Sequence, residues 1–234
     1  MNIALLLAAG TDPTFRMDIP KQFVNVNNRP IIVYTMEAFQ NHPEIDVIMV
    51  ACLKGWENMV AAYAKQFEIG KLRWVIPGGK TGQETSRLAV DRLMEECCAE
   101  DIIVIHDAIR PLVSDAIISD SIDTCKRKGM GVAAVTSMDN VMMTDDGRTG
   151  KLSISRYAVR RIQTPQTYCL GELQRAHAEA QEKGIRGQID TNNMISALGR
   201  PVHFSQGSDK NLKINTVEDV AMFRTLYTMK KEDV

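Results

Sequence analysis

Short apolar segments alternate with amphipathic segments along residues 3–135, and this alternation restricts the possible folds more than any other feature of the chain. Apolar runs rich in Val and Ile predict buried strands, and apolar residues at helical spacing predict helices between them. This order is typical of βαβ units, so we expect an α/β fold with a twisted, mostly parallel sheet and helices on both faces. The predicted strands are Ile3–Ala8, Val47–Cys52, Arg73–Ile76, Ile102–Ile105 and Gly131–Val135, and the predicted helices are Ile31–Gln40, Trp56–Phe67, Glu84–Glu96 and Ile117–Lys128.

The alternation stops at residues 136–163, which hold few apolar residues and a turn at Asp145-Asp146-Gly147 between extended segments. We expect a protruding hairpin arm there, and an arm that cannot bury itself commonly packs on a second copy of the chain. After it, Leu170–Lys183 and Val217–Lys230 predict helices, with short strands at His203–Ser205 and Asn211–Ile214. The expected organisation is a single domain over residues 1–234, with a dimerisation arm at 136–163 that forms a homodimer.

The overall charge gives no sign of a nucleic-acid or membrane partner. The 234 residues include 28 basic and 29 acidic side chains, a formal net charge of -1, so any basic site must be local. No apolar run approaches the roughly 18 residues that span a bilayer. The five cysteines follow no metal-binding spacing and are best explained as free thiols in a reducing cytosol, so we expect a cytoplasmic protein.

Small residues follow the first predicted strand, at Ala8-Ala9-Gly10, and a loop with Arg16 and Lys21 comes next. Small residues let backbone N–H groups approach an anion, which the two cations then neutralise. Gly78-Gly79 and His106-Asp107 also follow predicted strands. The carboxyl ends of parallel strands meet at one edge, where such sheets bind ligands. The sequence therefore predicts a site for a phosphorylated substrate, most simply a nucleotide.

Other residues near these strand ends have more than one explanation. Asp107 could hold Mg²⁺ or a ligand hydroxyl, or it could be a helix cap or an ion-pair partner of Arg110. His106 is better explained as a hydrogen-bonded buried histidine than as a catalytic base. Gly78-Gly79 with Thr85 could form a base-and-ribose pocket or an ordinary turn before a helix. No Ser-His-Asp order, Cys-His pair or HExxH motif supports hydrolysis by a nucleophile or zinc.

Taken in order, these motifs resemble the sugar-alcohol-phosphate cytidylyltransferases, a family that contains the 2-C-methyl-D-erythritol 4-phosphate enzymes of isoprenoid biosynthesis and the ribitol-5-phosphate enzymes of cell-wall polymer synthesis. The resemblance covers about residues 3–226 and depends on Ala8-Ala9-Gly10, Arg16-Met17, Pro20-Lys21-Gln22, Gly78-Gly79, His106-Asp107-Ala108-Ile109-Arg110-Pro111, Thr164-Pro165-Gln166 and Asn211-Leu212-Lys213-Ile214 with Glu218-Asp219. It implies a Rossmann-like nucleotidyltransferase sheet with a dimerising arm.

The resemblance also implies a role for each matching residue. Arg16, Lys21 and Lys213 would be the catalytic cations on the phosphates, and Asp107 would face Mg²⁺ or the polyol. Asn140, Arg156 and Thr164 would contact the polyol phosphate, Asn140 and Arg156 reaching from the arm into the site of the other subunit. The nucleotide CTP would lie against Ala8, Ala9, Gly10, Gly78, Thr85, Asp107 and Ala108.

The chain departs from the family pattern at two places that matter here. The family usually has three residues between the glycine and the arginine of AAGxGxRM, whereas Thr11–Phe15 supplies five and no second glycine. Gly82 stands where the GGxxR segment usually has an arginine. Glu84-Thr85 and Pro30-Ile31-Ile32-Val33 are closer to the ribitol branch, so we expect a CTP-dependent transferase that favours ribitol 5-phosphate slightly over 2-C-methyl-D-erythritol 4-phosphate.

Two further functions compete with this prediction. A catalytically inactive nucleotide-binding dimer would also account for the altered glycine loop. A dinucleotide-dependent oxidoreductase would need G-x-G-x-x-G after the first strand, and Gly10–Phe15 does not supply it.

Overall fold

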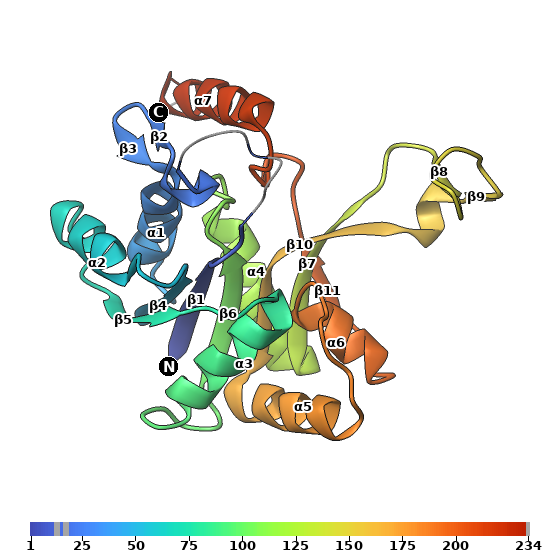
Figure 1. Ribbon diagram of the computed structural model, residues 1–234, viewed down its shortest axis with the longest axis horizontal. Coiled ribbons are helices and arrows are strands. Elements are labelled where there is room, and N and C mark those ends of the chain that lie inside the picture. Colours follow the sequence, from blue (N-terminus) through green and yellow to red (C-terminus); the bar gives the residue numbers. More distant parts are fainter. Residues whose placement is uncertain (12–14, 16–18, 233–234) are drawn as a thin grey trace.

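A seven-stranded, mostly parallel sheet forms the centre of the protein in the computed structural model, which describes residues 1–11, 15 and 19–232 (Figure 1). The strands lie in the order β11-β7-β10-β6-β1-β4-β5. The five strands predicted from apolar runs are all present and differ from the prediction only at their ends. Their bounds are β1 Asn2–Ala8, β4 Val47–Cys52, β5 Leu72–Pro77, β6 Ile102–Asp107, β7 Met130–Thr136, β10 Arg160–Cys169 and β11 Phe204–Gln206.

Strand register brings the chemically interesting loops to one edge of the sheet. Strand β1 pairs in parallel with β6 and with β4, and β4 pairs in parallel with β5. Leu7 lies opposite Asp107, Ala8 opposite Cys52, and Cys52 opposite Pro77. The loops that follow β1, β5 and β6 therefore emerge side by side, which confirms the predicted meeting of the glycine loops with His106-Asp107.

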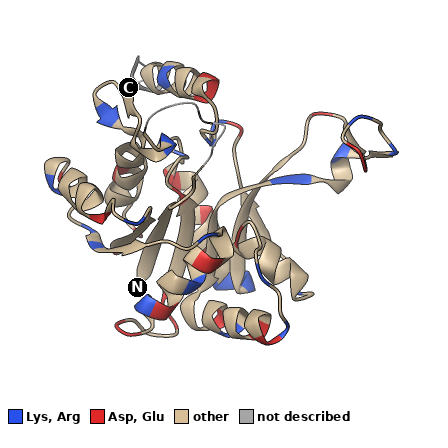
Figure 2. Ribbon diagram, in the orientation of Figure 1, with Lys and Arg blue, Asp and Glu red and all other residues tan. Residues whose placement is uncertain are grey.

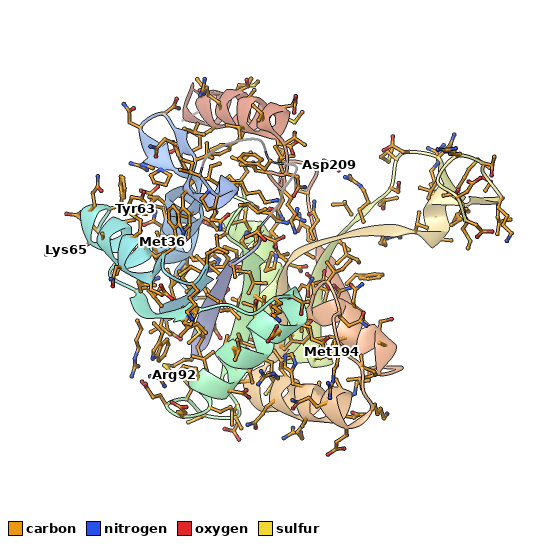
Figure 3. All side chains as sticks on the ribbon, viewed as in Figure 1. Met36, Tyr63, Lys65, Arg92, Met194 and Asp209 are labelled. Atoms are coloured by element: carbon orange, nitrogen blue, oxygen red, sulfur yellow. The ribbon has the colours of Figure 1, made fainter. Side chains whose placement is uncertain are left out.

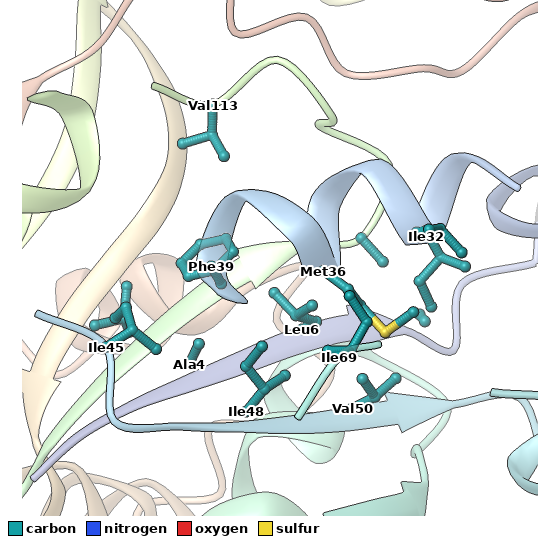
Figure 4. Close-up of a cluster of buried hydrophobic side chains, with 14 of the residues drawn as sticks. Ala4, Leu6, Ile32, Met36, Phe39, Ile45, Ile48, Val50, Ile69 and Val113 are labelled. Carbon is teal, nitrogen blue, oxygen red and sulfur yellow. The ribbon is translucent and has the colours of Figure 1, made fainter. Parts of the chain in front are cut away.

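Helices cover both faces because side chains alternate along each strand. Ala4 and Leu6 of β1 pack against α1 and α4 on one face, in the cluster that Figure 4 shows around Met36 and Phe39. Leu5 belongs to the cluster on the opposite face, under α3, α5 and α6. Figure 3 labels one residue of each cluster, Met36 of α1 and Met194 of α6. The helices are α1 Ile31–Asn41, α2 Glu57–Gln66, α3 Gly82–Leu93, α4 Asp115–Lys128, α5 Leu170–Glu182, α6 Thr191–Ala197 and α7 Val217–Glu232.

A third apolar cluster holds α7 beside the carboxyl edge of the sheet. Phe223 of α7 contacts the ring of Tyr34 at a centroid distance of 5.0 Å, and Ile214 and Ile109 belong to the same cluster. The small hairpin of β2 (Asn25–Val26) and β3 (Arg29–Pro30) packs here through Val26. This cluster fixes the segment that precedes α7 close to the loop that follows β6.

Two of the segments that differ from the sequence prediction matter for the site. The expected strand at Asn211–Ile214 is wrong: this segment is irregular and crosses the edge of the sheet, held by single bonds such as Ile214 N–H to the Ile109 carbonyl at 2.9 Å. Strand β10, which was not predicted, lies antiparallel between β6 and β7. Its register shifts between Ile162 and Gln166, where the chain accommodates Pro165 after a cis peptide bond.

The segment between β7 and β10 forms a separate antiparallel hairpin of β8 (Val141–Met143) and β9 (Leu152–Ile154). Figure 1 shows this hairpin extending away from the central sheet. Basic and acidic residues are mixed along it, as Figure 2 shows. Because Arg160 pairs with Thr136 of β7, residues 160–163 of the predicted arm belong to the central sheet instead. A role of the hairpin in dimerisation stays a prediction. Among the described residues, no helix is both long and apolar enough to cross a membrane.

Candidate active site

A cavity of about 550 Å³ lies at the carboxyl edge of the sheet. Its walls come from the loops after β1, β5 and β6, from β10, from the start of α6 and from the segment before α7. The residues that matter below are Ala8, Ala9, Gly10, Lys21, Gln22, Gly79, Gly82, Thr85, Asp107, Arg110, Thr164, Asp190 and Lys213. Residues from opposite ends of the chain therefore face the same space.

The turn after β1 is held by Gln22. This side chain is buried, and its amide donates to the Ala8 carbonyl at 2.6 Å and to the Gly10 carbonyl at 3.5 Å. Gln22 sits in the short 3-10 turn η1 (Lys21–Phe23), so the same residue that anchors the small-residue turn also fixes Lys21 beside it. The ammonium of Lys21 donates to Asn215 Oδ1 at 3.2 Å. This bond joins the N-terminal loop to the start of α7.

Hydrogen bonds hold the loop after β5 against the first turn of α3. Gly79 N–H donates to the Thr85 hydroxyl at 3.0 Å, and that hydroxyl donates to the Thr81 carbonyl at 2.9 Å. Thr81 caps α3 by accepting from Glu84 N–H at 3.1 Å. Gly78 has no room for a side chain, because a Cβ there would lie 2.3 Å from Ala9 Cβ. The turns after β1 and β5 thus touch each other and form one continuous wall.

Three charged side chains form a cluster on the next wall. Asp107 accepts from Arg110 Nε at 2.8 Å and lies 3.1 Å from Lys213 Nζ. Burial by itself would raise the pKa of Asp107, but Lys213 and Arg110 outweigh it and lower this pKa to about 2. Asp107 is therefore ionised at neutral pH, and its charge holds both cations in place. The predicted ion pair with Arg110 is present, together with a second one.

Hydrogen bonds bring Lys213 to this cluster from the far end of the sequence. Arg110 Nη1 donates to the Asn211 carbonyl, and Asn211 Nδ2 donates to the Thr164 carbonyl, each at 2.8 Å. Thr164 also accepts from Asp107 N–H at 3.0 Å. The segment at residues 211–214 is thus fastened to β10 and to the loop after β6, which orients Lys213 toward Asp107.

His106 has no access to the cavity. It is fully buried, and its ring contacts the Arg110 carbonyl at 3.2 Å and the Thr164 hydroxyl at 3.0 Å. Burial lowers its pKa to about 4, so the ring is neutral at pH 7. The prediction that His106 is a hydrogen-bonded buried histidine is confirmed.

Most of the residues that the sequence and the resemblance assigned to the site line the cavity. These are Ala8, Ala9, Gly10, Lys21, Thr85, Asp107, Thr164 and Lys213. Gly78 does not face the cavity itself, although its neighbour Gly79 does, and Ala108 is fully buried behind the wall. Asn140 and Arg156 belong to the segment that carries the β8–β9 hairpin and do not line this cavity. Arg16 lies outside the described residues.

Several polar residues of the cavity were not assigned from the sequence, and three of them matter most here: Gln22, Arg110 and Asp190. Gln22 acts through backbone carbonyls, which leave no pattern in a sequence. The sequence suggested Arg110 only as an ion-pair partner of Asp107, and its burial became visible only in the structure. Asp190 precedes α6, a helix too short to show a clear apolar period, and the helix-capping position of Asp190 was the one available signal.

The described residues do not form a metal cage, since no three His, Cys, Asp or Glu side chains among them come together. In the charged cluster, Asp107 is the carboxylate, and both of its oxygens already contact cations. Mg²⁺ commonly binds through one or two carboxylates plus substrate phosphates. Asp107 is therefore the carboxylate of this cluster that could contact an ion held chiefly by a bound phosphate chain.

Comparison with known proteins gives the same assignment as these motifs. A family model described as "IspD: 2-C-methyl-D-erythritol 4-phosphate cytidylyltransferase" matches residues 2–228. A ribitol-5-phosphate cytidylyltransferase of Lacticaseibacillus paracasei is 40% identical over 99% of this chain and 100% of its own length. A 2-C-methyl-D-erythritol 4-phosphate cytidylyltransferase of Clostridium novyi is 30% identical over 94% of each chain.

Solved structures agree with this result. The 2-C-methyl-D-erythritol 4-phosphate cytidylyltransferase of Thermus thermophilus superposes with a TM-score of 0.75 at 26% identity, over 96% of this chain and 98% of that one. A crystal structure of a 4-diphosphocytidyl-2C-methyl-D-erythritol synthase gives a TM-score of 0.80 at 25% identity, over 97% and 98% of the two chains. The chain is therefore a nucleotidyltransferase that belongs to the 2-C-methyl-D-erythritol 4-phosphate cytidylyltransferase family.

Proposed function

We propose that this enzyme transfers the cytidylyl group of CTP to ribitol 5-phosphate, with release of pyrophosphate. The observation that carries the proposal is the cavity itself, where Lys21 and Lys213 face the same space beside the small-residue turn after β1. A site built from cations and backbone suits a polyanionic substrate. The higher identity to a protein named for ribitol 5-phosphate, 40% against 30%, supports the choice of polyol.

In the proposed reaction, the phosphate of the polyol attacks the α-phosphorus of CTP in line, and pyrophosphate leaves. A phosphomonoester has a second pKa of about 6, so most of the nucleophile is already ionised at pH 7. No general base is needed, which agrees with the buried, neutral state of His106. The remaining obstacle is repulsion between two polyanions and the charge that builds up on the leaving group.

The charged cluster addresses that obstacle. Asp107 offsets one of the two cations that it binds, so the cluster of Asp107, Arg110 and Lys213 keeps one net positive charge, and Lys21 adds another. Asp107 fixes the direction of Lys213, so little reorganisation is needed when the phosphates arrive. Arg16 is proposed to add a further cation. Asp107 is the residue that would hold a Mg²⁺ ion, which would supply further neutralisation of the phosphate charge.

The nucleoside of CTP is proposed to lie against Ala8, Ala9, Gly10, Thr85 and the Gly78-Gly79 turn. Support comes from the close contact between the turns after β1 and β5, which leaves a flat wall with few side chains. Thr85 is engaged with this turn through Gly79 and Thr81. Such a wall suits a base and a ribose that approach the backbone closely.

We also propose that the β8–β9 hairpin binds a second copy of the chain and brings Asn140 and Arg156 to the site of that copy. Support comes from large apolar side chains exposed on and beside the hairpin, including Met142, Leu152 and Tyr157, whose exposed fractions are 55%, 58% and 82%. Burying such side chains on a partner would stabilise a C2 dimer. A cytosolic location is proposed as well, because all five cysteines are free.

Pyrophosphate release from CTP tests the proposed function directly, with ribitol 5-phosphate and 2-C-methyl-D-erythritol 4-phosphate as alternative acceptors. We expect a higher kcat/KM with ribitol 5-phosphate. A higher value with the methylerythritol substrate would favour the function named by the family model, which is the second candidate. Nucleotide binding without turnover of either acceptor would instead indicate an inactive nucleotide-binding dimer.

A further inference from the structure

The connection between α5 and α6 supplies a wall of the cavity that the proposed mechanism does not use. Its last two residues, Ile189 and Asp190, face the cavity. The connection is held against the first turn of α3 by Gln83, a buried residue outside the cavity lining. Gln83 Nε2 donates to the Ile185 carbonyl at 2.9 Å, and Gln83 Oε1 accepts from Gln188 N–H at 3.0 Å. These bonds fix both ends of residues 185–188.

Gly82 lets this connection approach α3 more closely than a side chain would allow. A Cβ at residue 82 would lie 2.1 Å from the Ile189 carbonyl oxygen and 3.2 Å from Asp190 Cα. Both are backbone atoms, so no rotation of a side chain could relieve the clash. The position of Ile189 and Asp190 in the cavity wall therefore requires glycine at residue 82.

Asp190 brings a carboxylate to this wall without a cationic partner in the described parts of the chain, where no Lys or Arg forms an ion pair with it. It accepts from Asn193 N–H at 3.2 Å, from the side-chain amide of Gln166 and, with the amide of Asn192 turned over, from that side chain as well. These donors are uncharged. Burial raises the pKa of Asp190, the hydrogen bonds from Asn193 and Gln166 lower it, and the charges of Asp107 and Lys213 act in opposite directions. Asp190 lines the same cavity as Asp107 and Lys213 of the charged cluster.

The charge of Asp190 determines which part of a substrate it can bind. A carboxylate repels phosphate oxygens but accepts hydrogen bonds from hydroxyl groups. If the phosphate of the acceptor lies on the cations beside Asp107, the polyol chain is the part of the acceptor that offers hydroxyl groups to Asp190. Ribitol 5-phosphate has one more hydroxyl than 2-C-methyl-D-erythritol 4-phosphate, which carries a methyl branch instead.

We propose that residues 185–190 form the wall that selects the polyol, with Asp190 accepting a hydrogen bond from a hydroxyl of the acceptor and with Gly82 and Gln83 seating the wall. This inference rests on the proposed function and adds the residues that determine acceptor choice. Asp190 contacts the substrate, whereas Gln83 and Gly82 are positioning residues that act through the backbone of residues 185–190.

Steady-state kinetics of Asp190→Ser test the contact. Serine keeps the helix cap but is too short to reach the acceptor. We expect the KM for ribitol 5-phosphate to rise about 10- to 100-fold, as for a lost hydrogen bond to a charged group, with the KM for CTP unchanged. Asp190→Asn, which keeps an acceptor oxygen, should recover part of the loss. A rise in the KM for CTP alone would assign Asp190 to the nucleotide and overturn the proposal.

Deoxygenated acceptors make the same test independent of protein stability. Ribitol 5-phosphates that each lack one hydroxyl should be poorer substrates of the wild-type enzyme than ribitol 5-phosphate. For the analogue that lacks the hydroxyl bound by Asp190, Asp190→Ser should cause no further loss of activity. If every analogue loses as much with the variant as with the wild type, Asp190 binds no hydroxyl and the proposal is overturned.

Gln83→Ala tests the seating of the wall, with Gln181→Ala as its control because Gln181 is an exposed glutamine of α5, outside residues 185–190. We expect Gln83→Ala to reduce the preference for ribitol 5-phosphate over the methylerythritol substrate about tenfold, and Gln181→Ala to leave it unchanged. An unchanged preference in Gln83→Ala would overturn the positioning role. A wild-type enzyme that uses no polyol phosphate would refute the proposed function and this inference together, whereas an active wild type with unaffected variants would refute this inference alone.

Discussion

Replacing Gly78 by alanine tests whether the turns after β1 and β5 form one tightly packed wall. The added Cβ would lie 2.3 Å from Ala9 Cβ and 3.2 Å from Thr85 Cγ2. Carbon atoms in contact normally lie about 3.5 Å or more apart, so one side must move by roughly 1 Å. The methyl of Ala9 is fixed to its backbone, so the end of β1 has to move with it.

Overpacking of this kind costs roughly 1–3 kcal/mol of unfolding free energy. For a chain of this size, about 2 kcal/mol lowers the Tm by roughly 4–8 °C. Because Ala9 and Gly10 line the cavity, we expect the KM for CTP to rise as well. Thermal unfolding and steady-state kinetics measure the two effects on the same protein.

Gly70→Ala is the matched control. Gly70 is exposed at the turn before β5, and a Cβ there meets no described atom within 4 Å. We expect its Tm and its KM for CTP to stay at the wild-type values. If Gly78→Ala also kept both values, the close contact between the two turns would not exist and the reasoning about the nucleoside wall would be refuted.

Three further predictions concern charge. Lys21→Ala should lower kcat about 10²-fold or more, because a donor to a developing charge is lost. Lys54→Ala, at the same edge of the sheet, should leave kcat unchanged. Equal kcat values for the two variants would contradict the role of Lys21. Arg156→Ala should weaken the binding of the polyol phosphate and leave CTP binding intact, and calorimetry with the opposite pattern would argue against the arm. His177 is a buried residue of α5, and burial lowers its pKa to about 4. As the pH falls below about 6.5, the unfolded chain therefore binds a proton at this residue before the folded chain does. The free energy of unfolding then decreases by up to about 1.4 kcal/mol per pH unit down to pH 4. Denaturation of His177→Gln over this range should show a shallower pH dependence, and an identical slope would contradict the assignment.

Regular apolar patterns made much of the sheet predictable. Strands such as Val47–Cys52 are buried on both faces and appear as continuous apolar runs, so their positions follow from the sequence. Their parallel order then places the loops after β1, β5 and β6 at one edge, which is why Ala8 and Asp107 could be assigned to one site. Strand β10 was not predicted because a proline such as Pro165 argues against a central strand. The register shift between Ile162 and Gln166 accommodates Pro165 within the sheet.

The remaining residues of the site depend on contacts that join distant parts of the chain. Gln22 bonds to backbone carbonyls, and Gln83 bonds to a connection about 100 residues away, so neither leaves a local pattern. Gly82 was noticed only as a departure from the family motif. Its physical reason, the approach of the Ile189 carbonyl, required the three-dimensional structure.

A crystal structure of the enzyme with bound CTP is the most direct test of the claim that cations from both ends of the chain hold the same phosphates. The account predicts phosphate oxygens within about 3 Å of the ammonium groups of both Lys21 and Lys213. A triphosphate bound elsewhere, or one that contacts neither lysine, would contradict it.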